Sequence, residues 1–162
     1  MPNSITPFNT PLETGVRSLT LLEAVFPLSI DLQRLVDFDY LVVHSGDAGG
    51  PQSLHVPLPL RTGEMLVRRE IIESGLLLMM SRGLVRRIPS STGIQYQASD
   101  AANPFLSALS SSYMTKLKER AAWVAKRFRD TTNEELREIT RHFFEDWTTQ
   151  FQPIESSFGS TK

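Results

Sequence analysis

The chain has 162 residues, of which 40% are hydrophobic and 22% are charged, and it carries a formal net charge of −1. These values exclude wholesale disorder and predict one globular unit with a single core. They also exclude a general electrostatic attraction to nucleic acid, and the absence of cysteine excludes disulfides and thiolate metal sites.

Nothing in the sequence predicts a membrane association. The longest apolar run, residues 76–80, is far shorter than the ~20 residues needed to span a bilayer. The first ten residues, MPNSITPFNT, contain no basic residue ahead of an apolar core and do not resemble a signal peptide. Since cysteine is also absent, we expect a cytoplasmic protein.

The first helix is predicted to follow a flexible N-terminal arm at residues 1–9. In the tetrapeptide TPLE, which starts at Thr10, threonine can cap the helix and proline fits the first helical position. The glutamate can reach back to the cap, which completes a strong start signal. An apolar stripe follows, and Pro27 is predicted to end the helix.

A second helix is predicted to follow Ser29 or Asp31 and to run to about Ser45. It is apolar nearly all round toward its end, which predicts a central, buried helix. Its charged side chains are expected to mark a solvated face. They are Asp31, Arg34, Asp37 and Asp39.

Residues 46–62 follow without periodicity and with three prolines. A loop of this length is unusual inside a compact domain. The sequence therefore predicts a functional segment, a segment that a partner holds in place, or element boundaries that lie elsewhere.

Residues 64–98 are the stretch around which the domain is organised. Apolar residues recur there at spacings near a helical face. They are Leu66, Ile71, Leu77, Met80 and Leu84. Gly83 stands where a left-handed residue commonly ends a helix, and the period then falls to two on either side of a Ser-Ser-Thr-Gly turn. The order of two helices, a third helix and then a hairpin predicts a winged-helix domain over residues 10–98.

Residues 99–151 are predicted to form C-terminal helices that pack on this core or on a partner, and residues 152–162 are predicted to form a loose tail. An Asn-Pro pair at Asn103 is expected to start a short helix, and a longer basic helix follows. Thr132 and Glu135 form a capping box for the last helix. The predicted fold class is mainly α with a small β-hairpin, as a winged-helix domain followed by C-terminal helices.

The sequence predicts no catalytic, metal or cofactor site. The glycine-rich loop after Ser45 lacks the Gly-Lys-Ser/Thr ending of a phosphate-binding loop and follows a helix instead of a strand. The histidines at positions 44, 55 and 142 lack metal-ligand spacing. A nucleophilic site could be assembled from His44, Ser45 and Asp47, but any chain of this size offers such combinations of residue types. We expect a protein that is not an enzyme and binds no cofactor.

Six arginines on or near the predicted third helix and hairpin are candidate contacts to nucleic acid or to a partner. They are Arg61, Arg68, Arg69, Arg82, Arg86 and Arg87. With Glu64, Glu70 and Glu73 in the same stretch, the formal charge of residues 61–98 is 6 − 3 = +3. Because these glutamates repel phosphates and few base-reading side chains are present, we favour contacts to a partner protein over direct reading of a DNA sequence.

Two basic and three aromatic residues near the C-terminus are candidates for docking on a partner. They are Lys118, Arg127, Phe144, Trp147 and Phe151. Phe144 lies off the main apolar stripe of the last helix, so this helix is expected to show apolar surface on two sides.

Five segments together resemble one protein family. They are FNTPLETGVRSLTLLEA, SIDLQRLVDFDYLVVHSGD, GEMLVRREIIESGLLLMMSRGLV, GIQYQA and FLSALSSSYMTKLKERAAWVAKRF, in this order within residues 8–129. In these segments the chain resembles the middle component of bacterial ABC-three-component systems. It is also similar to the small accessory subunit of the Lamassu anti-phage SMC complexes.

The resemblance implies a non-catalytic winged-helix subunit. Such a subunit binds an SMC- or Rad50-like ATPase and helps to hold or regulate an effector, often a nuclease, until foreign DNA ends or replication structures are sensed. Contact with DNA is then made mainly through the complex, and the family supplies no catalytic residues to carry over. The alternative that the helix and hairpin leave open is a stand-alone winged-helix transcriptional regulator that binds DNA.

Overall fold

Helix α1 (Pro11–Val25) begins where the sequence predicts it. The computed structural model describes residues 10–55 and 64–143, so the arm predicted at residues 1–9 and the tail predicted at residues 152–162 lie outside the described residues. Thr10 is the N-cap, and its hydroxyl accepts a hydrogen bond from the backbone N–H of Glu13 at 3.2 Å.

Helix α2 (Leu32–Val43) follows directly on a short strand, β1 (Ile30–Asp31). Asp31 caps the helix, because its carboxylate accepts a hydrogen bond from the backbone N–H of Arg34 at 2.8 Å. The prediction of a buried helix that starts after Asp31 is confirmed, since most residues of α2 are buried. The alternation rule does not detect β1, because two residues are too few to show a period.

Helix α3 (Glu64–Ser81) ends in the manner that Gly83 predicts. Gly83 has a φ of 70°, in the left-handed region that glycine adopts without strain. The backbone N–H groups of Gly83 and Leu84 donate to the carbonyls of Met80 and Met79, each at 3.0 Å. This pair of bonds is a Schellman motif, which satisfies carbonyl groups that the end of a helix leaves open.

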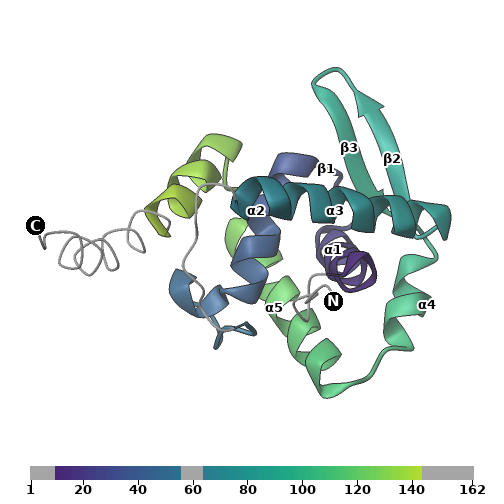
Figure 1. Cartoon of the computed structure of the whole chain (residues 1–162), viewed down its shortest axis with the longest axis horizontal. Helices are drawn as coiled ribbons and strands as arrows, with labels where there is room; N and C mark the ends of the chain where they lie inside the picture. The colour runs from purple at the N-terminus through teal and green to yellow at the C-terminus, as the bar shows by residue number, and fades with distance from the viewer. Residues whose placement is uncertain (1–9, 56–63, 144–162) are drawn as a thin grey trace, which may run out of the picture.

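Strands β2 (Val85–Ser90) and β3 (Gly93–Ala98) form the predicted hairpin, which projects away from the helices in Figure 1. β3 pairs antiparallel with both β2 and β1, so the strand order is β1-β3-β2. Val85 and Ala98 pair at the base of the hairpin and are buried. Their burial anchors one face of the hairpin to the helices.

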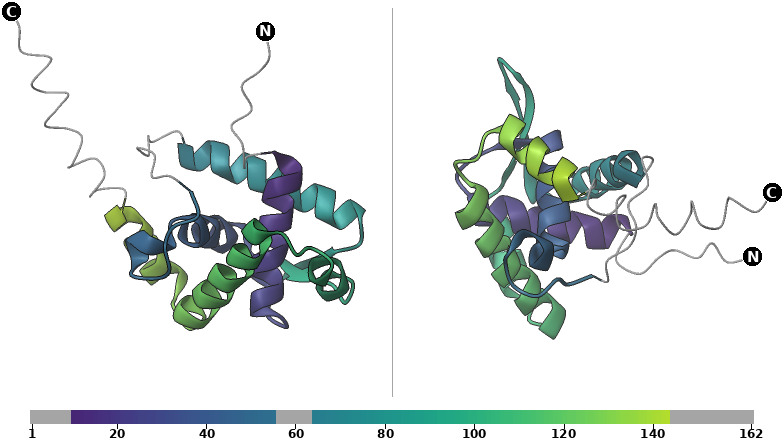
Figure 2. Two further views of the ribbon diagram at one scale, coloured as in Figure 1. Left: turned by 90° about the horizontal axis from the view of Figure 1, so that it is seen from below. Right: turned by 90° about the vertical axis from the view of Figure 1, so that its left-hand side faces the viewer.

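Helix α1 lies between α3 on one side and α5 (Ser112–Phe128) on the other, and α2 contacts the same three helices (Figures 1 and 2). Helix α4 (Ala102–Ser107) connects the hairpin to α5, and residues 133–143 are helical, with Leu136 fully buried. The fold is thus mainly helical with a small three-stranded antiparallel sheet. None of the described helices is long and apolar enough to cross a membrane.

The core-facing residues of α3 differ from the predicted stripe. Ile72, Leu76 and Met79 are buried, whereas Leu66 and Leu77 are exposed by 67% and 64%. Apolar residues occupy several faces of residues 71–80, so their spacing alone does not fix which face turns inward. The correct face is set by the neighbour on which α3 packs, which is α1.

The predicted start of α4 is wrong by two residues, since Ala101 is the residue that precedes the helix. Asn103 lies inside the first turn, where its side-chain amide donates to Glu23 of α1 at 3.1 Å instead of capping the helix. The capping box further along is confirmed. The backbone N–H of Glu135 donates to the Thr132 hydroxyl at 3.1 Å, and the Thr132 N–H donates to the Glu135 carboxylate at 3.3 Å.

The segment that follows α2 is held by α5. It opens with a 3₁₀ turn, η1 (Ser45–Ala48), and an added Cβ at Gly50 would lie 2.4 Å from the ring of Trp123. The Arg120 side chain donates to the carbonyl of Gln52 at 2.7 Å. The described part of the predicted long loop is therefore fixed within the chain itself, and residues 56–63 lie outside the described residues.

Candidate functional site

Three helices meet at a buried ion cluster made of Arg17 in α1, Asp39 in α2 and Arg68 in α3. The Arg17 guanidinium donates to both carboxylate oxygens of Asp39, at 2.5 and 3.2 Å, and Arg68 donates to one of them at 2.5 Å. The Asp39 side chain has no exposed surface, and the Arg17 side chain is almost fully buried. The cluster fixes α3 relative to the other two helices, because α3 carries Arg68.

The charges of this cluster stabilise one another. Burial alone would raise the pKa of Asp39, but the guanidinium groups of Arg17 and Arg68 outweigh it and hold that pKa below its ordinary value. Burial would lower the pKa of Arg17, and the charge of Asp39 more than offsets that effect, so the pKa of Arg17 is raised. Arg17 and Asp39 therefore stay ionised in the core.

The predicted solvated face of α2 is wrong for two of its four residues. Asp39 is fully buried and Asp37 is only 2% exposed. Carboxylates are rarely buried unless they are paired, and the partners of Asp39 lie 22 and 29 residues away in the chain. A local pattern cannot identify such partners. The available signal is that Asp37 and Asp39 interrupt an otherwise apolar run at residues 35–43.

Asp37 is also buried, but among the described residues it has no guanidinium within ion-pair distance of the kind that Asp39 has. The side-chain amide of Gln33 donates a hydrogen bond to its carboxylate at 3.4 Å. Burial raises the pKa of Asp37 to about 6, and Gln33 and Arg137 offset this only in part. Ionised Asp37 therefore lowers the stability of the fold at neutral pH.

We expect Asp37→Asn to stabilise the protein in a pH-dependent way. The folded-state pKa is above the ordinary value of 3.8, so the favourable contribution of the protonated group is lost as the pH rises through about 6. The variant should be more stable than the wild type by about 1–3 kcal/mol at pH 7.5 and by clearly less at pH 5. Urea unfolding at both pH values measures the difference.

The control for this prediction is the exposed Asp130→Asn, which should change the free energy of unfolding by less than about 0.5 kcal/mol at either pH. An Asp37→Asn variant whose gain is the same at pH 5 and pH 7.5 would show that ionisation of Asp37 is not the cause.

The polar core continues from Arg17 toward the segment after α2. The Tyr113 hydroxyl of α5 interacts with Arg17 and lies 3.1 Å from Nε2 of His55. Burial, followed by the nearby charge of Arg17, lowers the pKa of His55 to about 4. The backbone N–H of His55 donates to the carbonyl of Val43 at 3.2 Å, so this histidine holds its segment against the end of α2.

His44, Ser45 and Asp47, the combination that the sequence allows as a nucleophilic site, follow α2 directly. His44 is buried, its ring centroid lies 4.8 Å from that of Tyr40, and burial followed by the charge of Arg68 lowers its pKa to about 4. The Ser45 hydroxyl donates to the carbonyl of Pro51 at 2.8 Å. Within residues 10–55 and 64–143, no group of three or more His, Asp or Glu side chains is placed to hold a metal ion.

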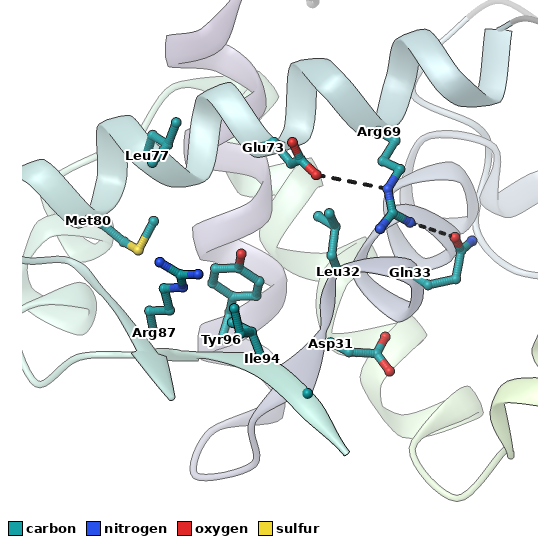
Figure 3. A pocket seen from close by; sticks show the side chains of 11 residues that line it. Asp31, Leu32, Gln33, Arg69, Glu73, Leu77, Met80, Arg87, Ile94 and Tyr96 are labelled. Atoms are coloured by element: carbon teal, nitrogen blue, oxygen red, sulfur yellow. Dashed lines mark hydrogen bonds and ion pairs between the residues drawn. The ribbon is translucent and has the colours of Figure 1, made fainter. Parts of the chain in front are cut away.

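A groove of about 630 Å³ separates α3 from the inner face of the hairpin, with the start of α2 at its floor (Figure 3). We call it the α3–hairpin groove. It is lined by Asp31, Leu32, Gln33, Arg69, Glu73, Leu77, Met80, Arg87, Gly93, Ile94 and Tyr96. The spacing of its α3 residues, at positions 69, 73, 77 and 80, places them on one side of that helix.

The walls of the groove combine apolar surface with charges of both signs. Figure 3 shows the Arg69 guanidinium between Gln33, to which it donates at 3.0 Å, and Glu73, which lies at 3.9 Å. Arg87 reaches in from β2 beside Tyr96, its cross-strand neighbour. Arg69 thus offsets the negative charge of Glu73 at one end of the groove, and Arg87 lies at the other end.

The side of α3 that turns away from the core carries exposed leucines and glutamates. Leu66 and Leu77 are the most exposed large apolar residues on this surface, and Val67 is exposed by 54%. Glu70 and Glu73 are also exposed and lie between them. We call residues 66, 67, 70, 73 and 77 the α3 outer face. Two of these residues, Glu73 and Leu77, also line the α3–hairpin groove.

The structure separates the arginines that the sequence groups together. Arg68 is used in the buried cluster, Arg69 and Arg87 line the groove, and Arg86 on the opposite face of β2 lies 3.6 Å from Asp100. Arg82 is exposed after the end of α3. Arg61 lies outside the described residues.

The C-terminal candidates are also divided. Lys118 donates to the carbonyls of Leu106 and Leu109, each at 2.7 Å, so it holds the end of α4. Arg127 lies over the ring of Phe128, with 5.1 Å between its guanidinium carbon and the ring centroid. Phe144, Trp147 and Phe151 lie outside the described residues.

Comparison with known proteins gives one family match. The family model described as the ABC-three component (ABC-3C) system Middle Component 2 matches residues 7–150, which is most of the chain. Comparison with curated proteins and with solved structures gives no match. The matched range includes the buried ion cluster, the α3–hairpin groove and the α3 outer face.

Proposed function

This chain belongs to the Middle Component 2 family of ABC-three-component systems, and on that premise we propose that it is a non-catalytic accessory subunit. In this role it joins an SMC- or Rad50-like ATPase to a nuclease-type effector in bacterial defence against phages or plasmids. The similarity to the accessory subunit of Lamassu complexes belongs to the same proposal. The chain acts by contact alone and leaves the chemistry to its partners.

A winged-helix architecture is part of the proposal. The order helix, strand, helix, helix, strand, strand from α1 to β3 supports it, as does the three-stranded antiparallel sheet. In such a domain α3 corresponds to the helix that enters the DNA major groove, and the hairpin corresponds to the wing. The side chains on α3 then indicate what this domain contacts.

The α3 outer face is the observation that carries the proposal. A helix that reads DNA presents cations and hydrogen-bonding side chains to the phosphates and base edges. Here the exposed positions hold Leu66, Val67 and Leu77, with Glu70 between them. Exposed leucines lose unfavourable contact with water when a protein covers them, whereas the glutamates repel phosphate. The face therefore favours a protein partner, and we assign it to the ATPase subunit.

The runner-up function is a stand-alone DNA-binding regulator. The observation in its favour is the exposure of Arg82, Arg86 and Arg87 near the hairpin. A regulator of this kind shifts a short duplex with a steep salt dependence. Binding of the isolated full-length chain to duplex DNA across a salt series decides this point, and affinity that rises strongly at low salt would favour the regulator.

The proposal is tested by measuring the affinity of the full-length chain for the ATPase subunit of its own system. We expect a stable complex, and we expect Leu77→Asp to weaken it at least about tenfold, because the aspartate places a charge where apolar surface is covered. The control is Leu28→Asp, which changes an exposed leucine in the turn after α1. A wild-type chain that does not bind the ATPase, or equal losses in both variants, would contradict the proposal.

A further inference from the structure

We propose that the α3–hairpin groove takes an acidic amphipathic helix of the partner subunit, and that Arg87 pairs with a carboxylate on that helix. This inference rests on the proposed function, because it names the part of the partner that binds. It concerns the chemistry of the occupant, which the family match does not specify.

The charges of the groove indicate a carboxylate. Glu73 has Arg69 as its ionic neighbour, and Asp31 accepts hydrogen bonds from the Arg34 backbone and from Asn133. Among the described residues, the side chain of Arg87 has neither an ion-pair nor a hydrogen-bond partner. The two acidic and two basic residues that line the groove sum to zero formal charge. Because Arg87 alone among them has no ion-pair or hydrogen-bond partner within the described residues, an occupant with a negative group next to Arg87 complements it.

The apolar surface indicates the rest of the occupant. Leu77 of α3 and Ile94 of β3 face the groove from opposite walls and are exposed by 64% and 39%. Tyr96 and Met80 lie between them and are half-buried. A small charged ligand would leave this surface in water, whereas a row of apolar side chains would cover it.

The hairpin favours a helix over an added strand. β2 is an edge strand, and strands of a partner can pair with such edges. However, β2 carries Arg86, Arg87 and Pro89. Charged side chains and proline are features that block pairing at a sheet edge, and proline has no N–H to donate. An amphipathic helix needs no edge, since its apolar stripe docks on the side chains of the groove.

The matched pair of tests is Arg87→Glu against Arg86→Glu. Both residues are exposed on β2, but only Arg87 faces the groove, because neighbouring side chains of a strand point to opposite faces. We expect Arg87→Glu to weaken binding to the ATPase subunit by about tenfold or more and Arg86→Glu to change it by less than about threefold. Titration of the full-length variants against the ATPase subunit measures both.

The occupant is identified by replacing Ile94 with the photoreactive residue p-benzoylphenylalanine in the assembled complex. Mass spectrometry of the cross-linked product should give a partner peptide with apolar residues at helical spacing and an Asp or Glu beside them. Replacing that acidic residue with arginine should restore the binding of Arg87→Glu to within about threefold of the wild type.

The outcomes separate this inference from the proposed function. If the wild-type chain does not bind the ATPase subunit, the proposed function fails. If it binds while Arg87→Glu and Arg86→Glu behave alike, the inference about the groove fails and the proposed function stands. A cross-link from position 94 to DNA, or to a partner segment without a carboxylate, also overturns the inference.

Discussion

Replacement of Asp39 with alanine is expected to lower the free energy of unfolding by about 3–5 kcal/mol. Asp39 is fully buried and accepts hydrogen bonds from both Arg17 and Arg68. Without the carboxylate, the Arg17 guanidinium stays in the core without its counter-ion. Chemical denaturation of the full-length variant at pH 7, followed by circular dichroism, measures the loss.

Two further variants separate the buried charge from a general effect of mutation. Asp100→Ala removes the exposed partner of Arg86 and should cost less than about 1 kcal/mol. The double variant Arg17→Met with Asp39→Leu should be more stable than Asp39→Leu alone, because it removes the isolated charge together with its partner. A loss below about 1 kcal/mol for Asp39→Ala would mean that the cluster does not fix α3.

Gly75→Ala should destabilise the protein by about 3 kcal/mol, although the same change in an ordinary helix interior stabilises by ~1 kcal/mol. Gly75 of α3 lies against Gly15 of α1, and an added Cβ at Gly75 would lie 2.6 Å from the backbone nitrogen of Gly15. The obstacle is backbone, which cannot rotate away as a side chain can. The two helices must therefore separate or shift.

The neighbouring Ser74→Ala is the control for this crossing, since Ser74 is exposed on the same helix. It should change the free energy of unfolding by less than about 0.5 kcal/mol. Gly15→Ala should also be destabilising, because its Cβ would lie 2.8 Å from the Gly75 carbonyl oxygen. Thermal or chemical unfolding that finds Gly75→Ala as stable as the wild type would contradict the close contact of α1 with α3.

Local signals in the sequence predict several helix ends correctly, with the start of α4 as an exception. The residues that the sequence marks as helix caps do cap helices in the structure. They are Thr10, Asp31, Gly83 and the pair of Thr132 with Glu135. Each of these effects depends on hydrogen bonds within a few residues, so the sequence contains the necessary information. The hairpin after Gly83 is predicted for the same reason.

Interactions between distant parts of the chain account for what the sequence does not predict. The prediction that Asp39 lies on a solvated face is wrong, because its two arginine partners come from other helices. The inward face of α3 depends on the contact between Gly15 and Gly75, which no periodic pattern reveals. The pairing of Ile30 with Tyr96 in β1 and β3 likewise joins residues that are far apart in the sequence.

Some residues of the candidate site are predicted correctly from the sequence, and others are not. The sequence singles out Arg69 and Arg87 as contact residues, and the fold brings them to one groove. It also singles out Arg68 and Lys118, whose side chains are instead used inside the chain. Leu77 belongs to the predicted apolar stripe of this helix, but the structure exposes it, and this exposure is what makes α3 a candidate surface for a partner.

A cryo-electron microscopy structure of the chain assembled with the ATPase and effector of its own system tests the central claim most directly. The account predicts that a protein segment covers Leu66 and Leu77 on α3 and enters the groove beside Arg87. Duplex DNA lying along α3, or an α3 outer face left in solvent while the partners bind elsewhere, would contradict it.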